Sequence, residues 1–120
     1  MSDEKIVKAV QAMILNVNNL SDIRSLEKEI YFKYKQYVWS ILESTGGDYT
    51  LYYYPNAVEV ADVVDEDGVF LGSRFLSHSA SEFGPGARET FGKLYTVLEN
   101  LEFNFSSVLA DIIDDPFADE

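Results

Sequence analysis

The 120-residue sequence contains no cysteine, one histidine and only nine lysines and arginines. Without cysteine the chain can form neither disulfides nor thiolate metal sites, and it has no cysteine nucleophile. The absence also favours a reducing compartment, so we expect a cytoplasmic protein. The chain starts with acidic residues, and no apolar run approaches the roughly 18 residues of a membrane span. We therefore expect neither export nor membrane association.

Groups that carry chemistry are also scarce. His78 lies between Ser77 and Ser79, and neighbours in the chain rarely form a catalytic triad because the triad residues must converge in space. The acidic run 63–68 matches a calcium loop only in part, since Val63 occupies the first ligand position and Arg74 the closing one. The sequence thus predicts no enzyme, no metal site and no cofactor.

The negative charge is abundant and unevenly distributed. The net charge is −12, yet residues 1–40 hold six basic against five acidic residues, whereas residues 41–120 hold three against sixteen. Such a field repels phosphate backbones and anionic membranes and attracts basic surfaces. We expect no direct binding to nucleic acid or membranes, and a basic protein as the partner.

The chain has enough apolar material for one core, because 47% of its residues are hydrophobic and 14% are aromatic. A chain of this length fits one domain. We predict a single domain over residues 1–110 and an acidic C-terminal tail over residues 111–120.

Two helices are predicted before the first strand. Apolar residues recur at spacings of three and four from Asp3 to about Val17, which indicates an amphipathic helix. The same spacing continues from Ile23 through Ile30 to Ile41, so a second, long helix is predicted there, ending at Gly46-Gly47.

Three strands are predicted next. Residues 48–54 are rich in tyrosine and stop at Pro55, which indicates a first strand. Residues 57–64 and 69–76 flank an Asp67-Gly68 pair, and this pattern predicts a β-hairpin in which Val64 faces Leu71.

The helical period returns over residues 87–103, and Ser106-Ser107 can cap a last short helix. The predicted fold is α+β and two-layered, with two N-terminal helices, a three-stranded antiparallel meander and two C-terminal helices.

The candidate protein-interaction residues are of two kinds. Tyrosines occupy both faces of the first predicted strand, and tyrosine is enriched at interfaces. Acidic residues cluster on the hairpin and in the tail, where apolar residues alternate with them. The predicted interaction residues are Tyr52, Tyr54, Glu59, Asp62, Asp65, Glu66, Asp67, Asp111, Asp114, Asp115 and Phe117.

The leading hypothesis is a small acidic protein-interaction module, such as an immunity or inhibitor protein that masks a basic site on a toxin or nucleic-acid enzyme. Two alternatives stay open. One is a secretion-type chaperone, which would form a homodimer. The other is a domain that binds a small molecule between the sheet and the long helix, with Asp62 as its acid.

Overall fold

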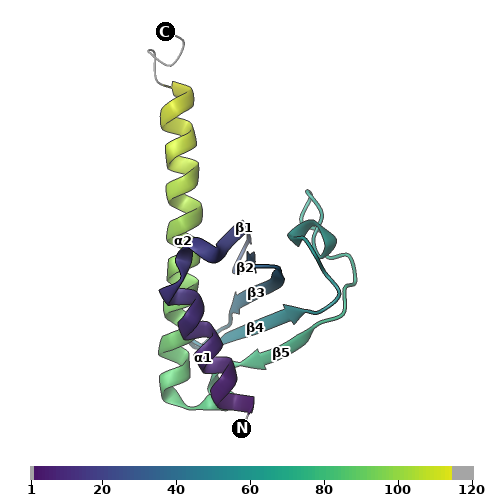
Figure 1. The fold of residues 1–120 in the computed structure, drawn as a ribbon, viewed down its shortest axis with the longest axis vertical. Helices are drawn as coiled ribbons and strands as arrows, with labels where there is room; N and C mark the ends of the chain where they lie inside the picture. The colour runs from purple at the N-terminus through teal and green to yellow at the C-terminus, as the bar shows by residue number, and fades with distance from the viewer. Residues whose placement is uncertain (1, 115–120) are drawn as a thin grey trace.

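The computed structural model describes residues 2–114, with side chains described for residues 5–84 and 86–102. Two α-helices frame a five-stranded sheet (Figure 1). The elements run in the order α1 (Ser2–Leu15), β1 (Leu20–Leu26), β2 (Glu29–Tyr34), β3 (Tyr37–Glu43), β4 (Tyr49–Tyr54), β5 (Leu76–Ser79) and α2 (Pro85–Asp114). Short 3-10 helices occur at Val17–Asn19, Val60–Asp62 and Ala80–Phe83.

The sheet is an antiparallel meander in which each strand pairs with the next one along the chain. Phe32 faces Trp39 across β2 and β3, and Trp39 faces Tyr53 across β3 and β4. The β1–β2 register shifts between Ser21 and Arg24, which marks a bulge. The exposed edges are therefore β1 and the short strand β5.

Both helices pack on one face of the sheet (Figure 1). The sheet contributes alternate apolar residues to this core, because side chains two apart on a strand point the same way. α2 contributes residues at helical spacing. The fully buried members include Val10 and Met13 of α1, Ile30 and Phe32 of β2, Ile41 of β3, Leu51 of β4, and Phe91, Leu94 and Leu98 of α2.

The opposite face of the sheet is covered by the connection between β4 and β5, residues 55–75. Val60, Val63 and Val64 of this connection are fully buried against Tyr31, Val38 and Tyr54. A second, smaller core thus lies between the sheet and a segment that is largely irregular.

The predicted architecture is wrong in its number of helices and strands. The structure has five strands and two α-helices in place of three strands and four helices. The segment predicted as a long second helix, around residues 22–41, forms β1, β2 and β3. The two predicted C-terminal helices are one continuous helix, α2, which also passes through the predicted start of the tail at residue 111.

The first error has a physical cause in the hairpin turns. Two-residue loops at 27–28 and 35–36 join β1 to β2 and β2 to β3, and Glu27 and Lys35 adopt positive φ angles of 55° and 57°. Glycine, asparagine and aspartate usually occupy such positions, and their absence removed the turn signal. The strands are also apolar on both faces, so polar and apolar residues do not alternate clearly along them.

The predicted hairpin over residues 57–76 is also wrong. Val64 pairs with Phe70 in a single isolated bridge, and residues 60–62 form a 3-10 helix. Of the predicted second arm, residues 69–76, only Leu76 joins the sheet, as the first residue of β5, which pairs with β4. The turn itself is present, because the Gly68 N–H donates to the Asp65 carbonyl at 3.0 Å.

Within the described residues, neither helix is long and apolar enough to cross a membrane.

We predict that Phe32→Ala lowers the free energy of unfolding by about 3–5 kcal/mol, because a ring buried between sheet and helices leaves a cavity. Val58→Ala is the matched control, since Val58 is 64% exposed, and we expect a change within about 0.5 kcal/mol. Urea denaturation of both variants measures the difference. Equal destabilisation would contradict the assignment of the main core.

Candidate protein-interaction surface

The β4–β5 connection is tied to the two strands farthest from its own ends. Lys33 Nζ of β2 lies 3.3 Å from Glu59 Oε1. In β1, the Asp22 carboxylate accepts the Val60 N–H at 3.3 Å, and Arg24 Nη1 donates to the Val64 carbonyl at 3.0 Å. The connection therefore crosses the sheet from β4 to β1 before it returns to β5.

The turn at the far end of the connection has a fixed geometry. The Asp65 carboxylate accepts the N–H groups of Asp67 and Val69 at 2.9 and 2.8 Å. Gly68 follows with a φ of +82°, and a Cβ at Gly68 would lie 3.1 Å from Leu26 Cδ2. Both the backbone angle and the close contact favour glycine at this position.

Beyond the turn, large apolar side chains point outward. Four of the seven residues 69–75 are apolar and between 44% and 55% exposed: Val69, Phe70, Leu71 and Phe75. Phe75 packs edge-on against Tyr52 of β4, with ring centroids 5.3 Å apart, and lies 6.4 Å from the Phe70 ring. Contiguous exposed apolar residues are uncommon on a monomer and mark interaction sites.

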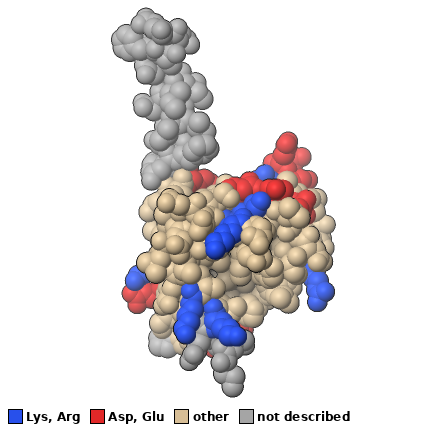
Figure 2. Space-filling view, in the orientation of Figure 1, with Lys and Arg blue, Asp and Glu red and all other residues tan. Residues whose placement is uncertain are grey.

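Acidic residues border this apolar group. Glu59, Asp62, Glu66 and Asp67 are exposed on the same connection, which contains one basic residue, Arg74. Figure 2 shows acidic atoms gathered over this part of the molecule. We call these four acidic residues and the four apolar residues the loop surface.

Asp62 is a surface carboxylate that shapes the backbone. It accepts the N–H groups of Glu59 and Val58, each at 2.9 Å. These two hydrogen bonds, that from Glu59 first, lower the pKa of Asp62 below its usual value. The side chain is therefore charged at neutral pH and is exposed to solvent.

A buried polar network lies beneath the loop surface, on the same face of the sheet. Ser40 Oγ donates to Glu29 Oε2 at 2.7 Å and lies 2.7 Å from the Tyr54 hydroxyl. The Tyr31 hydroxyl donates to Glu29 Oε1 at 3.1 Å. Burial, with the nearby Glu29 carboxylate as a further cause, raises the pKa of both Tyr31 and Tyr54 far above the usual value. The network keeps these hydroxyls neutral and bonded, and so fixes the strands under the connection.

The structure separates the predicted interaction residues. Tyr52 is half-buried beside Phe75, and Asp65 is half-buried in the turn, whereas Tyr54 is 3% exposed and bonds to Ser40. Glu59, Asp62, Glu66 and Asp67 are exposed together.

The tail residues divide differently. The backbone of Asp111 and Asp114 is helical, at the end of α2. Asp115 and Phe117 lie outside the described residues.

Sequence reasoning missed the apolar part of the loop surface. The predicted hairpin placed Leu71 and Phe75 on its core face, which hid them, and it placed Phe70 on the opposite face. The available signal was the density of apolar residues, because only Gly72, Ser73 and Arg74 of residues 69–75 are not apolar. A connection one chain thick cannot bury all the others.

No group of three or more histidine, cysteine, aspartate or glutamate side chains within the described residues is arranged to hold a metal ion. No protein-family model, curated protein or solved structure matches this chain. The surface must therefore be interpreted from its own chemistry.

We predict that stability falls as the pH rises above about 10, where a free tyrosine ionises. The pKa values of Tyr31 and Tyr54 are raised in the folded state, so folding favours their protonated forms. Their contribution is complete below the unfolded-state pKa and is lost as the pH rises toward the folded-state pKa.

Urea denaturation between pH 8 and pH 11, at about four values, measures this dependence. In Tyr31→Phe/Tyr54→Phe the free energy of unfolding should depend less steeply on pH, whereas the control Tyr37→Phe, 43% exposed, should keep the wild-type slope. An unchanged slope in the double variant would show that other groups cause the dependence.

Proposed function

We propose that this protein is a protein-interaction module whose loop surface binds a basic protein partner. The observation that carries the proposal is the exposure of Val69, Phe70, Leu71 and Phe75 beside four exposed carboxylates, on a segment whose inner side is core. The most concrete form of this function is an inhibitor or immunity-type protein that covers a basic site on a toxin or nucleic-acid enzyme.

The two kinds of residue support different parts of binding. Apolar and aromatic side chains provide affinity when they fill a partner's pocket, because their removal from water is favourable and their ordering costs little conformational entropy. The carboxylates speed encounter with a basic surface and reject acidic ones. The partner that fits therefore presents an apolar depression rimmed by lysine or arginine.

Anchoring of the connection lowers the cost of binding. The contacts from Lys33, Asp22 and Arg24 hold the segment before a partner arrives. A surface that is already ordered loses little conformational entropy on association. This favours a docking role over that of a segment that folds on binding.

The alternative of a small-molecule site that uses Asp62 lacks support from the geometry. A catalytic acid in an apolar pocket would show a raised pKa, whereas the pKa of Asp62 is lowered by its backbone hydrogen bonds.

The absence of cysteine supports the cytoplasm as the compartment of the proposed function.

The test compares three baits in affinity capture from the native cell: wild type, Val69→Ser/Leu71→Ser and Leu15→Ser. Val69 and Leu71 are 55% and 51% exposed, and Leu15 is an exposed leucine on α1 outside the loop surface. We expect a basic protein that wild type and Leu15→Ser retain and that the loop variant loses. A partner retained by all three baits would contradict the proposal.

Titration of the purified partner then tests the charge. Glu66→Lys should slow association markedly at low ionic strength and much less at high ionic strength, because salt screens exposed charges. Glu99→Lys makes the same charge change on α2, which packs on the other face of the sheet, and should have a smaller effect. Association insensitive to both salt and Glu66→Lys would exclude electrostatic docking.

A further inference from the structure

The last part of α2 extends beyond the rest of the chain. The molecule measures 57 × 30 × 27 Å, and residues 103–114 add about 18 Å of helix at 1.5 Å per residue. Among the described residues, no strand or other helix lies beside this projecting segment (Figure 1). Helices in water draw most of their stability from packing of an apolar face, so a covering surface is needed.

The sequence of the projecting segment provides such an apolar face. Five of its apolar residues occur at spacings of three and four: Phe105, Val108, Leu109, Ile112 and Ile113. Asp111 and Asp114 are its only charged residues. The segment is thus an acidic amphipathic helix.

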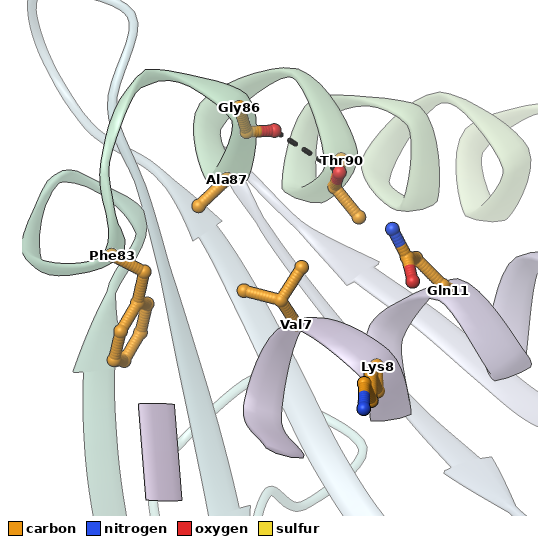
Figure 3. Close-up of a pocket in the computed structure, with 7 residues that line it drawn as sticks. All are labelled: Val7, Lys8, Gln11, Phe83, Gly86, Ala87 and Thr90. Atoms are coloured by element: carbon orange, nitrogen blue, oxygen red, sulfur yellow. Dashed lines mark hydrogen bonds between the residues drawn. The ribbon is translucent and has the colours of Figure 1, made fainter. Parts of the chain in front are cut away.

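A groove of matching character lies between α1 and the first turns of α2. Figure 3 shows Val7 and Gln11 of α1 directed toward Ala87 and Thr90 of α2. This part of the groove has a volume of about 430 Å³, and a further depression of about 240 Å³ adjoins it at Gln11 and Thr90 and reaches Leu15. Leu15 is 81% exposed there.

The groove is bordered by basic residues. Lys8 and Lys93 line its two parts, and both are exposed. Lys93 lies 3.7 Å from Glu89, but that pair is exposed on both sides and contributes little. The partial positive charge at the start of α2 has the same sign as the lysines.

The projecting segment cannot enter the groove of its own chain. The first turns of α2 form one wall of the groove, and Thr90 in that wall is separated from residue 110 of the same helix by about 30 Å along the helix axis. Only a second copy can bring the two together. If two α2 helices run antiparallel, with residue 100 near the symmetry axis, residue 110 of each copy lies beside residue 90 of the other.

We infer that two copies of this chain form an antiparallel dimer in which the projecting segment of each α2 lies in the α1–α2 groove of the other. This arrangement brings the apolar, acidic sequence 105–114 of one copy alongside Val7 and Leu15 of the other copy and alongside the lysines that border its groove. Each copy supplies one segment and one groove, so the assembly closes with two-fold symmetry. The loop surface lies on the other face of the sheet, so the dimer does not cover it. The dimer proposal does not depend on the proposed function.

A single spin label tests the arrangement, because the chain has no cysteine to compete with Ala110→Cys. The antiparallel dimer predicts a label separation of about 30 Å. A parallel pairing of the helices predicts about 10 Å, and a monomer gives no distance. Either of these last two results would overturn the proposal.

Sedimentation equilibrium of unlabelled variants tests the contacts. Ile112→Asp should raise the dimer dissociation constant at least about tenfold, since it places a charge in an apolar contact. Lys8→Glu/Lys93→Glu should also raise it about tenfold or more. Lys28→Glu/Lys35→Glu, an equal charge change at exposed sites outside the groove, should change it less than about threefold.

Circular dichroism of each variant checks that it is folded. Wild-type protein that stays monomeric through the micromolar range would overturn the proposal, as would equal weakening by the two lysine double variants.

Discussion

A sheet with apolar side chains on both faces must be covered on both, and this requirement organises the whole chain. The meander places Phe32 and Leu51 on one side and Tyr31 and Tyr54 on the other. Two helices from opposite ends of the sequence cover the first side. No α-helix remains for the second side within the described residues, so the connection between β4 and β5 covers it.

That solution gives the connection two chemically different sides. Its inner side is held by the burial of Val60, Val63 and Val64, and by bonds from Asp22 and Arg24 at the far edge of the sheet. A layer one chain thick can bury only one side, so the large apolar residues after the turn remain exposed. The proposed docking surface is therefore the outer side of the β4–β5 connection, whose inner side covers the sheet and stabilises it.

The predictable parts of the fold were those with a clear local signal in the sequence. α1 lies where the apolar spacing predicted a helix, and β4 lies where the tyrosine-rich run predicted a strand. The helix prediction for residues 22–41 was wrong because Ile23, Ile30 and Ile41 have the spacing of a helix, while the turn residues Glu27 and Lys35 give no turn signal. Burial on both faces removed the alternation that would have corrected the error.

For the candidate surface, the sequence predicted the acidic residues and not their apolar neighbours. Acidic residues can be counted from the sequence alone. The exposure of Phe70 and Leu71 depends on the fold, because their segment does not become a strand of the sheet. Tyr54 shows the converse, since its burial follows from its pairing with Val38 and from the connection that covers it.

The central claim is that the β4–β5 connection is an ordered layer of the fold, and amide hydrogen exchange tests it most directly. The Leu71 N–H donates to the Val63 carbonyl at 2.8 Å, and the Val64 N–H donates to the Val60 carbonyl at 3.1 Å. These amides should exchange as slowly as those of β3, because their opening requires the second core to open. Exchange at the rate of an unstructured loop, while β3 stays protected, would contradict the account.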